Sequence, residues 1–542
     1  MDDKTPAYPE SIIEFYTYYN TVQKLPYCLL LSRILLFVME TMRYLFLALT
    51  LCFSLPSFAA ERNIIFIITD DQSPTLGCYG DPVAYSPAVD SLATDGTLFQ
   101  RAYATTASCS ASRSVVMSGL HNHYNGQYGH THNYHKFESF RNVISLSLPR
   151  VLANEGYRTA QIGKYHVAPE EVFHYQTYLK GNARNAVQMA NASEAFITVN
   201  DDRPFFLYFA TSDPHRGGGK DKDYEGEFPP DLFGNRPHDG SFEGVEEKFY
   251  GPKDVIVPAF LPDTHESRTE LAQYYQSCAR IDQGVGRLIE ILKENDLYDK
   301  TLMVFTSDHG MAFPGAKTTI YEGGLRVPFI VRDPYQKNRG VQSNAMISHI
   351  DITPSLLDFA FGLDKKKNQP KKIIPASTFY KGKNYVFMEN MGTGKMDTYH
   401  GKSWIGILGN PRARHWDVIF GSHTFHEIQM YYPMRSVNDG QYKLIWNIAA
   451  GLPYPFASDL WAASTWQAQL AKGDDTPYGL MTVNEYVNRP TWELYHLADT
   501  GHEDKNLAYD PYYASVLERL QGKLKEYQEK MNDPWIIKWR YE

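Results

Sequence analysis

The chain has 542 residues, of which 43% are hydrophobic and 21% charged, and its formal net charge is −9. This composition argues against a disordered or coiled-coil protein and allows a large domain together with a smaller one. A general nucleic-acid binder is disfavoured by the net negative charge, because a phosphate backbone needs a clustered face of lysine and arginine. A polyanionic ligand is not excluded, since it needs positive charge only inside its pocket.

The first sixty residues have the character of a targeting segment. Met42–Ala60 has a short basic start, an apolar stretch and small residues suited to cleavage near Ala60, which predicts a secreted or periplasmic protein. The true start is then expected at Met39 or Met42. An upstream apolar run, residues 27–38, contains Arg33 and is too short to span a bilayer. A membrane anchor is the alternative interpretation of this region.

Five cysteines are few for a secreted chain of this length, which argues against a disulfide scaffold. Cys28 and Cys52 lie in the segment expected to be removed. If Cys109 serves chemistry, Cys78 and Cys278 remain as buried thiols or as one disulfide, and the sequence does not choose between them.

Continuous apolar, β-branched runs recur along the chain and predict strands buried on both faces. The first is Asn63–Thr69, and similar runs cover residues 158–162, 204–210 and 301–305. Each ends in polar residues that are candidates for chemistry: Asp70, Asp71, Lys164, His166, His215, Asp308 and His309. Helical periodicity lies between the runs, most clearly over residues 270–292. This alternation predicts an α/β fold, a large and mostly parallel sheet between helices, with a ligand site beyond the carboxyl ends of the strands.

After about residue 360 the pattern weakens. Strand-like pieces at residues 442–446 and 492–495 and a helix around residues 515–530 predict a smaller α+β domain built on an antiparallel sheet. The predicted organisation is therefore a targeting region over residues 1–60, a catalytic domain over 61–430 and a C-terminal subdomain over 431–542.

The segment Ser108–Arg113 carries the most specific signal. It begins a predicted helix, so Cys109 would sit at a helix N-terminus, where backbone N–H groups and the helix dipole favour a negative group. Taken alone, a cysteine is more often a half-buried core residue. The residues around it favour the functional interpretation.

Cys109-Ser-Ala-Ser-Arg113 resembles the sulfatase signature Cys-x-Pro-Ser-Arg, with Ala111 where the family usually has proline. The resemblance covers nearly all of residues 63–535 and is strongest to the heparan N-sulfatase branch of that family. The segments that carry it are Asn125–Gly129, Phe205–Tyr208, Asp213–Arg216, Ala279–Gly286, His426-Glu427, Tyr432–Val437 and Asn532–Trp535. It implies an alkaline-phosphatase-like fold, a homodimer, and a maturation enzyme that oxidises Cys109 to formylglycine.

The resemblance also implies roles for individual residues. A calcium ion would be held by Asp70, Asp71, Asp308, His309 and residue 109, and His309 stands where this branch usually has asparagine. Hard oxygen ligands suit Ca²⁺, although a bare Asp-Asp pair is more often a solvated turn. The positions that match the family's other active-site residues are Arg113, Lys164, His166, His215 and Lys317, the last replacing an arginine. Candidate substrate contacts are His423, His426, Glu427 and Arg435.

The implied reaction removes the N-sulfate of the non-reducing terminal N-sulfoglucosamine of heparan sulfate or heparin oligosaccharides. The formylglycine hydrate would attack sulfur, His215 or secondly Lys317 would protonate the leaving nitrogen, and His166 would take the proton of the second hydroxyl. Three alternatives remain: an O-sulfatase, for example on glucosamine 6-O-sulfate; a non-catalytic binder of sulfated glycans if Cys109 is unmodified; and a phosphate or phosphonate ester hydrolase.

A histidine-rich run over residues 121–135 invites a transition-metal interpretation. No cysteine or carboxylate accompanies these histidines, so a substrate-facing loop or simple packing is favoured.

Overall fold

The structure is a computed structural model that describes residues 37–42, 62–132, 136–236, 242–364, 369–370 and 398–541. The chain forms two units, residues 1–60 and 61–542. In the first unit the described residues, 37–42, are helical, and the predicted cleavage site lies outside the described part. Among the residues described, no helix is both long enough and apolar enough to cross a membrane.

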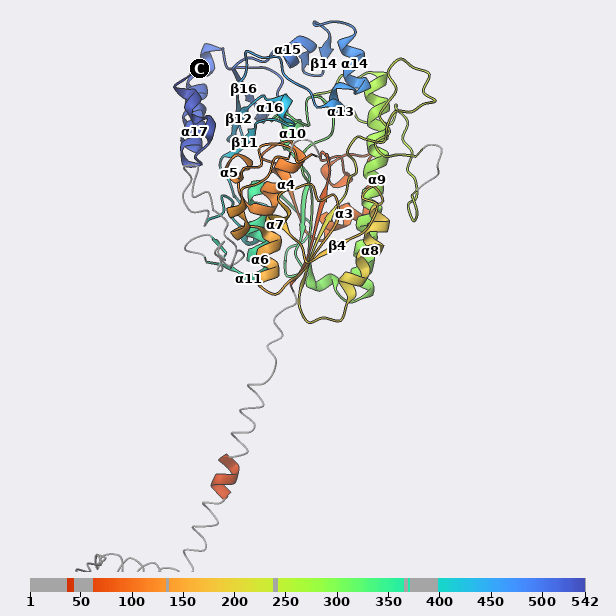
Figure 1. Ribbon diagram of the computed structural model, residues 1–542, viewed down its shortest axis with the longest axis vertical. Coiled ribbons are helices and arrows are strands. Elements are labelled where there is room, and N and C mark those ends of the chain that lie inside the picture. The colour runs from red at the N-terminus through yellow and green to blue at the C-terminus, as the bar shows by residue number, and fades with distance from the viewer. Residues whose placement is uncertain are drawn as a thin grey trace, which may run out of the picture. The chain divides into compact units, whose positions relative to one another are not determined.

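The second unit is built on an eight-stranded sheet with the strand order β4-β3-β5-β1-β6-β7-β2-β8 (Figure 1). All neighbours are parallel except β7, which is antiparallel to β6 and to β2. The mostly parallel sheet predicted from the sequence is therefore confirmed. Its strands are β1 Asn63–Thr69, β2 Thr97–Tyr103, β3 Arg158–Gly163, β4 Thr177–Leu179, β5 Phe205–Ala210, β6 Thr301–Ser307, β7 Phe329–Arg332 and β8 Val341–Ser348.

Strand β1 lies inside the sheet, and all seven of its residues are buried. Its continuous apolar run is typical of a parallel strand that is covered on both faces. Ile64 pairs with Phe206 of β5 on one side and with Leu302 of β6 on the other. The ladder continues past the strand ends, where the Asp70 amide donates to the Asp213 carbonyl at 3.1 Å and the Asp308 amide to the Thr69 carbonyl at 3.0 Å. These bonds fix the backbone of the first polar residues after the strands.

Helices cover both faces of the sheet, as the alternation of strand and helix predicts (Figure 1). Ile65 and Ile67 of β1 face one core, and Ile64, Phe66 and Ile68 face the other. The first core is covered by α3 Pro87–Thr94, α8 Ala186–Thr198 and α9 His265–Glu294. The second is covered by α4 Cys109–Ser118, α6 Leu148–Asn154 and α11 Ile352–Phe361.

The C-terminal part adds an antiparallel sheet in the order β11-β12-β13-β16, with α17 Ala514–Lys530 packed against it. The strands are β11 Ile419–His423, β12 Met434–Asn438, β13 Tyr442–Asn447 and β16 Trp492–His496. This confirms the predicted second sheet. The predicted boundary at residues 430 and 431 stays a prediction, and β11 precedes it.

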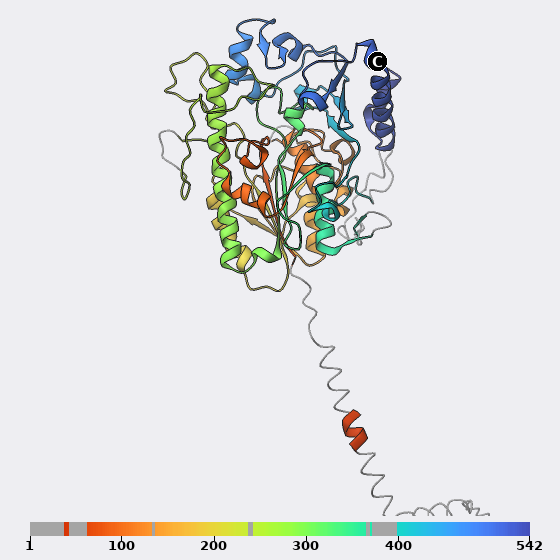
Figure 2. The same ribbon diagram turned by 180° about the vertical axis from the view of Figure 1, so that it is seen from behind.

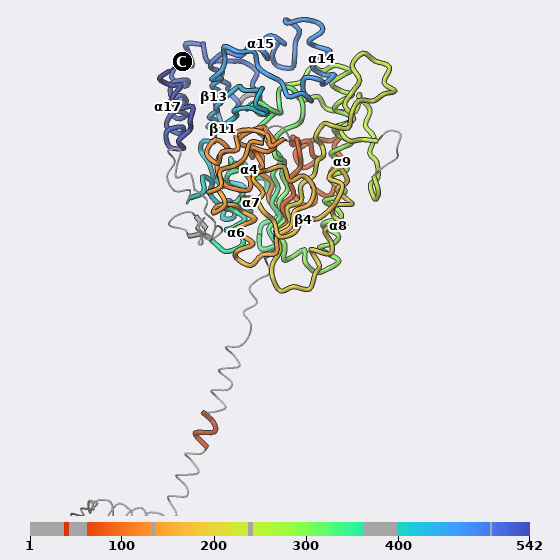
Figure 3. The backbone as a smooth tube through the Cα atoms, viewed as in Figure 1, coloured from red at the N-terminus to blue at the C-terminus, as the bar shows by residue number. Residues whose placement is uncertain are grey.

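Short elements complete the unit. The helices are α5 Asn122–Asn125, α7 Glu170–Phe173, α10 Glu322–Leu325, α13 Ser458–Trp461, α14 Ser464–Leu470, α15 Val483–Val487 and α16 Leu497–Thr500. Two small hairpin pairs are β9 Leu363–Asp364 with β10 Gln369–Pro370, and β14 Pro477–Tyr478 with β15 Met481–Thr482. From both sides, the C-terminal part, in blue, lies over the end of the main sheet where β1 and β6 finish (Figures 2 and 3).

Asp282 of α9 gives the fold a testable pH dependence. Its buried carboxylate accepts the Ala88 and Val89 amides of α3 at 3.2 and 2.8 Å, and burial raises its pKa to about 7 from an ordinary 3.8. As pH rises, Asp282 loses its proton near pH 4 in the unfolded chain but only near pH 7 in the folded protein. The free energy of unfolding therefore falls as pH rises from about 4 to about 7. Asparagine carries no charge at either pH, so we expect the effect of Asp282→Asn on the free energy of unfolding to be more favourable at pH 8 than at pH 4 by about 2 to 4 kcal/mol.

Urea unfolding at the two pH values measures this difference. Asp475→Asn, at an exposed aspartate, is the control and should change stability little at either pH. A gain for Asp282→Asn that is equal at pH 4 and pH 8 would contradict the prediction.

Candidate active site

Four residues that follow β1 and β6 meet at the carboxyl ends of these neighbouring strands. Asp70, Asp71, Asp308 and His309 are all fully buried. The Asp308 carboxylate oxygen Oδ1 accepts the amides of Asp71 and His309, each at 2.9 Å. Asp71 has φ 65°, in the left-handed region, which turns the chain sharply after the strand. The sequence prediction that these residues converge is confirmed.

Cys109 is the first residue of α4, and its buried side chain faces this cluster. Its Sγ lies 3.3 Å from His309 Nε2 and 3.6 Å from Asp71 Oδ1. Burial, reinforced by the charges of Asp71 and Asp70, raises the thiol pKa well above its ordinary value. The thiol is therefore protonated and is a poor nucleophile as it stands. Ala111, in the first turn of α4, occupies a position that proline would also fit, because first-turn amides have no partner within the helix.

Arg113 lies one turn further along α4 and joins the two strand ends. Its Nε donates to Asp308 Oδ2 at 3.0 Å and its Nη2 to Asp70 Oδ1 at 3.1 Å, with all three side chains completely buried. Burial raises the pKa of Asp308 to about 6 despite this partner. Burial would also raise the pKa of Asp70, but Lys164, His215 and Arg113 outweigh it and hold that pKa well below its usual range.

Lys164 and His166 follow β3 and reach the same cluster. The Lys164 ammonium pairs with Asp70 Oδ2, and 17% of its side chain remains exposed. His166 has φ 46°, and its buried Nδ1 has no hydrogen-bond partner among the residues that the structure describes. Burial and the neighbouring Lys164 charge hold the pKa of His166 well below its ordinary value, so this imidazole is neutral and able to accept a proton.

Lys317 is buried in the middle of three partners. Its ammonium donates to Asp71 Oδ2 at 2.9 Å, to Asp459 Oδ2 at 2.9 Å and to His215 Nε2 at 3.0 Å. His215 Nδ1 bonds the Arg216 carbonyl, which can only accept, so Nδ1 carries the imidazole proton. Burial and the Lys317 charge lower the pKa of His215, which is consistent with this neutral form.

Four side chains of the cluster offer ligand atoms that lie close enough together to hold a cation. One ligand atom each from Asp71, Cys109, Asp308 and His309 lies within 4.8 Å of the others. His309 Nδ1 donates to the Gly310 carbonyl at 3.0 Å, so Nε2, 3.1 Å from Asp71 Oδ1, is the nitrogen that would be available to a metal. These two atoms can share a cation, and the carboxylate oxygens suit a hard divalent ion. These donors fit a metal. Both oxygens of Asp70 are paired with Arg113 and Lys164, and both oxygens of Asp308 also have partners, Arg113 on one and two backbone amides on the other.

The four predicted substrate contacts lie in or beside the second sheet, and the structure does not bring all of them to the cluster. His426 Nδ1 lies 3.1 Å from Ser108 Oγ, directly before Cys109, while His423 Nδ1 contacts Thr106 Oγ1 at 3.4 Å. Glu427 is partly exposed and pairs with His132 at 3.2 Å. Arg435 is fully buried, and its guanidinium is occupied by a two-bond pair with Asp533 at 2.6 and 2.9 Å.

Some residues of the site are not indicated by the sequence. Asp459 of α13 holds Lys317 from the C-terminal part, and nothing in its local sequence marks it. His130 and His132, from the histidine-rich run, lie beside His166, with ring centroids 4.7 and 6.1 Å away. Cys78 and Cys278 form no disulfide, since both are free thiols in the structure.

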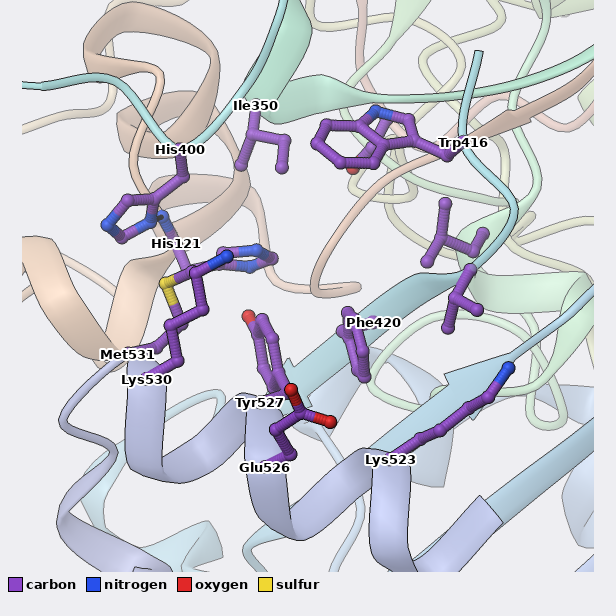
Figure 4. Close-up of a pocket in the computed structure, with 13 residues that line it drawn as sticks. His121, Ile350, His400, Trp416, Phe420, Lys523, Glu526, Tyr527, Lys530 and Met531 are labelled. Atoms are coloured by element: carbon purple, nitrogen blue, oxygen red, sulfur yellow. Dashed lines mark hydrogen bonds between the residues drawn. The ribbon is translucent and has the colours of Figure 1, made fainter. Parts of the chain in front are cut away.

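A separate cavity of about 290 Å³ lies between α17 and the end of β8 (Figure 4). Figure 4 shows Trp416, Phe420 and Tyr527 around it, with His121 on one wall. His121 follows the C-terminal end of α4, whereas Cys109 begins that helix. None of the predicted site residues lines this cavity, so it is distinct from the cluster at the strand ends.

Comparison with known proteins identifies the family. The family model described as Sulfatase matches residues 62–363, more than half of the chain. N-sulphoglucosamine sulphohydrolase of Homo sapiens is 35% identical over 506 residues, which cover 91% of this chain and 94% of the human protein.

Solved structures with lower identity share the fold. One, in complex with its substrate D-glucosamine-2-N,6-O-disulfate, has a TM-score of 0.57 and 19% identity, covering 87% of this chain and 98% of that chain. The phosphonate monoester hydrolase of Agrobacterium radiobacter has a TM-score of 0.56 and 17% identity, covering 86% and 96%. The family match and the 35% identity together show that this chain belongs to the sulfatase family and is a sulfate hydrolase.

Proposed function

We propose that this protein hydrolyses the N-sulfate group of non-reducing terminal N-sulfoglucosamine in heparan sulfate or heparin oligosaccharides. The observation that carries the proposal is the 35% identity to human N-sulphoglucosamine sulphohydrolase over almost the full length of both chains. The buried cluster of three carboxylates and three cations supports it, because a sulfate group needs positive charge held in a fixed place.

The proposed nucleophile is formylglycine made from Cys109, and the proposed cation is Ca²⁺ held by Asp71, Asp308, His309 and residue 109, with Asp70 beside them. The protonated, buried thiol supports conversion, since an unmodified Cys109 would be a poor nucleophile. The aldehyde hydrate would supply a hydroxyl group to attack sulfur, and Ca²⁺ would polarise the sulfate oxygens. Arg113 would orient the carboxylates that surround both groups.

The histidines and lysines would move the protons of the reaction. His166 is neutral, and its Nδ1 has no hydrogen-bond partner in the described part of the chain, so it would accept the proton of a hydroxyl at residue 109. The leaving nitrogen requires a proton, and the Lys317–His215 pair would supply it, because the Lys317 ammonium carries protons and already donates to His215 Nε2. Lys164, partly exposed, would contact a sulfate oxygen.

Asp459 provides a test of the role of Lys317. Asp459→Asn removes one of the two carboxylates that fix the Lys317 ammonium, so we expect kcat to fall about ten- to a hundredfold with a smaller change in KM. Initial rates of sulfate release over a range of substrate concentrations measure both constants. Asp459→Glu keeps the charge and should recover part of kcat. A variant Asp459→Asn with the wild-type kcat would contradict this role.

The proposed function is tested with two disaccharides. One carries a terminal N-sulfoglucosamine, and the other carries a terminal N-acetylglucosamine 6-O-sulfate. We expect inorganic sulfate from the first alone, and we expect a calcium chelator to reduce this rate. Release from the second alone would identify an O-sulfatase instead, and release from neither would direct attention to the chemical state of residue 109.

Three further proposals concern export, maturation and assembly. Export is proposed from the segment that ends near Ala60, which lies outside the described residues. A formylglycine-generating enzyme is the proposed maturation partner, and a homodimer is the proposed assembly. Analytical ultracentrifugation and N-terminal sequencing of the exported protein test the assembly and the cleavage site.

A further inference from the structure

Two loops from distant parts of the sequence meet next to the proposed reaction centre. The His130 amide donates to the His426 carbonyl at 2.8 Å, and the Thr131 amide donates to Ser110 Oγ at 3.1 Å in the first turn of α4. The approach is close because residue 129 is glycine: a Cβ there would lie 2.3 Å from the Phe425 ring. The loop before residue 132 is thereby fixed over the start of α4.

His130 is the unusual member of this loop. It is 3% exposed, yet neither of its ring nitrogens has a hydrogen-bond partner among the described residues. Its ring is close to those of His426 and His166, with centroids 3.6 and 4.7 Å away. Leaving two buried polar atoms unpaired is costly, so this position calls for a bound group that can both donate and accept.

The protonation state of His130 limits which chemical group can bind at its ring nitrogens. Burial and the neighbouring His426 and His166 rings hold the pKa of His130 well below its ordinary value, so the ring is neutral. A neutral imidazole has one N–H donor and one lone pair. A sugar hydroxyl can satisfy either nitrogen, because it donates and accepts, whereas a sulfate group offers oxygens that only accept.

The neighbouring residues add a negative charge. His132 stacks on His130 at a centroid distance of 5.0 Å, and its Nε2 lies 3.2 Å from Glu427 Oε1. Their side chains are 44% and 22% exposed, so this edge opens to solvent and to a ligand. A carboxylate here favours hydroxyl groups and disfavours a second sulfate through charge repulsion.

We infer that His130, His132 and Glu427 form a subsite for an unsulfated hydroxyl of the sugar that carries the scissile sulfate. The inference rests on the proposed function and deepens it, because it makes the enzyme selective against a further O-sulfate on that same glucosamine. Glu427 is the discriminating residue, and His130 is the residue that binds the hydroxyl group.

The test compares three disaccharides with terminal N-sulfoglucosamine: one without further sulfate on that sugar, one 3-O-sulfated and one 6-O-sulfated. The free amine formed is measured, so that O-sulfate release does not interfere. With the wild-type enzyme we expect kcat/KM for at least one disulfated sugar to be about tenfold or more below that of the monosulfated one. Glu427→Gln should narrow this ratio about tenfold, whereas Glu290→Gln, at an exposed carboxylate of α9, should leave it unchanged.

Variants of His130 test the hydroxyl contact. His130→Phe keeps a ring but removes both nitrogens, and we expect kcat/KM for the monosulfated sugar to fall about tenfold or more, while His130→Asn recovers part of it. The inference is overturned if the wild type converts all three sugars equally, if Glu427→Gln shifts the ratio no more than Glu290→Gln, or if His130→Phe is as active as wild type. The absence of any free amine from the monosulfated sugar with wild-type enzyme would instead refute the proposed function.

Discussion

Cys109→Ala is expected to reduce sulfate release from N-sulfoglucosamine by at least about a thousandfold, because alanine has no thiol to be oxidised and the formylglycine nucleophile cannot form. The fold should survive, since the substitution changes little volume at a fully buried position whose thiol makes only weak contacts. The assay is release of inorganic sulfate, accompanied by a thermal melt of each protein.

The matched control is Cys278→Ala, which removes another buried thiol outside the cluster and should keep most of the activity. Mass spectrometry of the wild-type peptide that contains residue 109 should show loss of the sulfur atom. If Cys109→Ala retained a substantial rate, the nucleophile would have to be another group, and the proposed mechanism would be wrong.

Arg113→Met is expected to lower the free energy of unfolding by about 3 to 5 kcal/mol, because it leaves two buried carboxylates without their shared cation. Both Asp70 and Asp308 are completely buried, so solvent cannot replace the guanidinium. Urea unfolding in a buffer with a chelator measures the loss, since a divalent cation bound to Asp308 would offset part of it.

Arg113→Lys is the companion variant. It restores the charge but not the two-pronged geometry that reaches both carboxylates, so its stability should lie between those of wild type and Arg113→Met. A loss below about 1 kcal/mol for Arg113→Met would show that the two carboxylates are protonated or otherwise compensated in the folded protein.

The sequence is most informative where local composition decides the structure. The apolar run Asn63–Thr69 predicts a strand and forms β1 with the same bounds, because a continuous apolar run has few alternatives to a buried parallel strand. The predicted helix over residues 270–292 forms the longer α9, His265–Glu294. Helix ends depend on caps, here the Thr264 side chain, which accepts the Ser267 amide, and periodicity does not show this.

The candidate site is predictable only in part. Acidic and basic residues at strand ends meet because parallel strands finish at one edge, and the sequence shows this. The Lys317–Asp459 contact joins residues 142 positions apart through packing of the C-terminal part on the main sheet, and no local pattern records it. The histidine-rich run also serves two places that its sequence does not distinguish. His121 lies beside the second cavity and His130 beside the active site, with one short helix between them.

Residue 109 has no solvent-exposed surface in the folded protein. If Cys109 is converted as proposed, the enzyme that oxidises its thiol would need that part of the chain in an extended form, so the conversion would have to be finished before β1, β6 and α4 come together. Protein purified in the unconverted state could then not be activated by later addition of a maturation enzyme unless it were first unfolded. The yield of active enzyme in a production host would depend on the competition between maturation and folding.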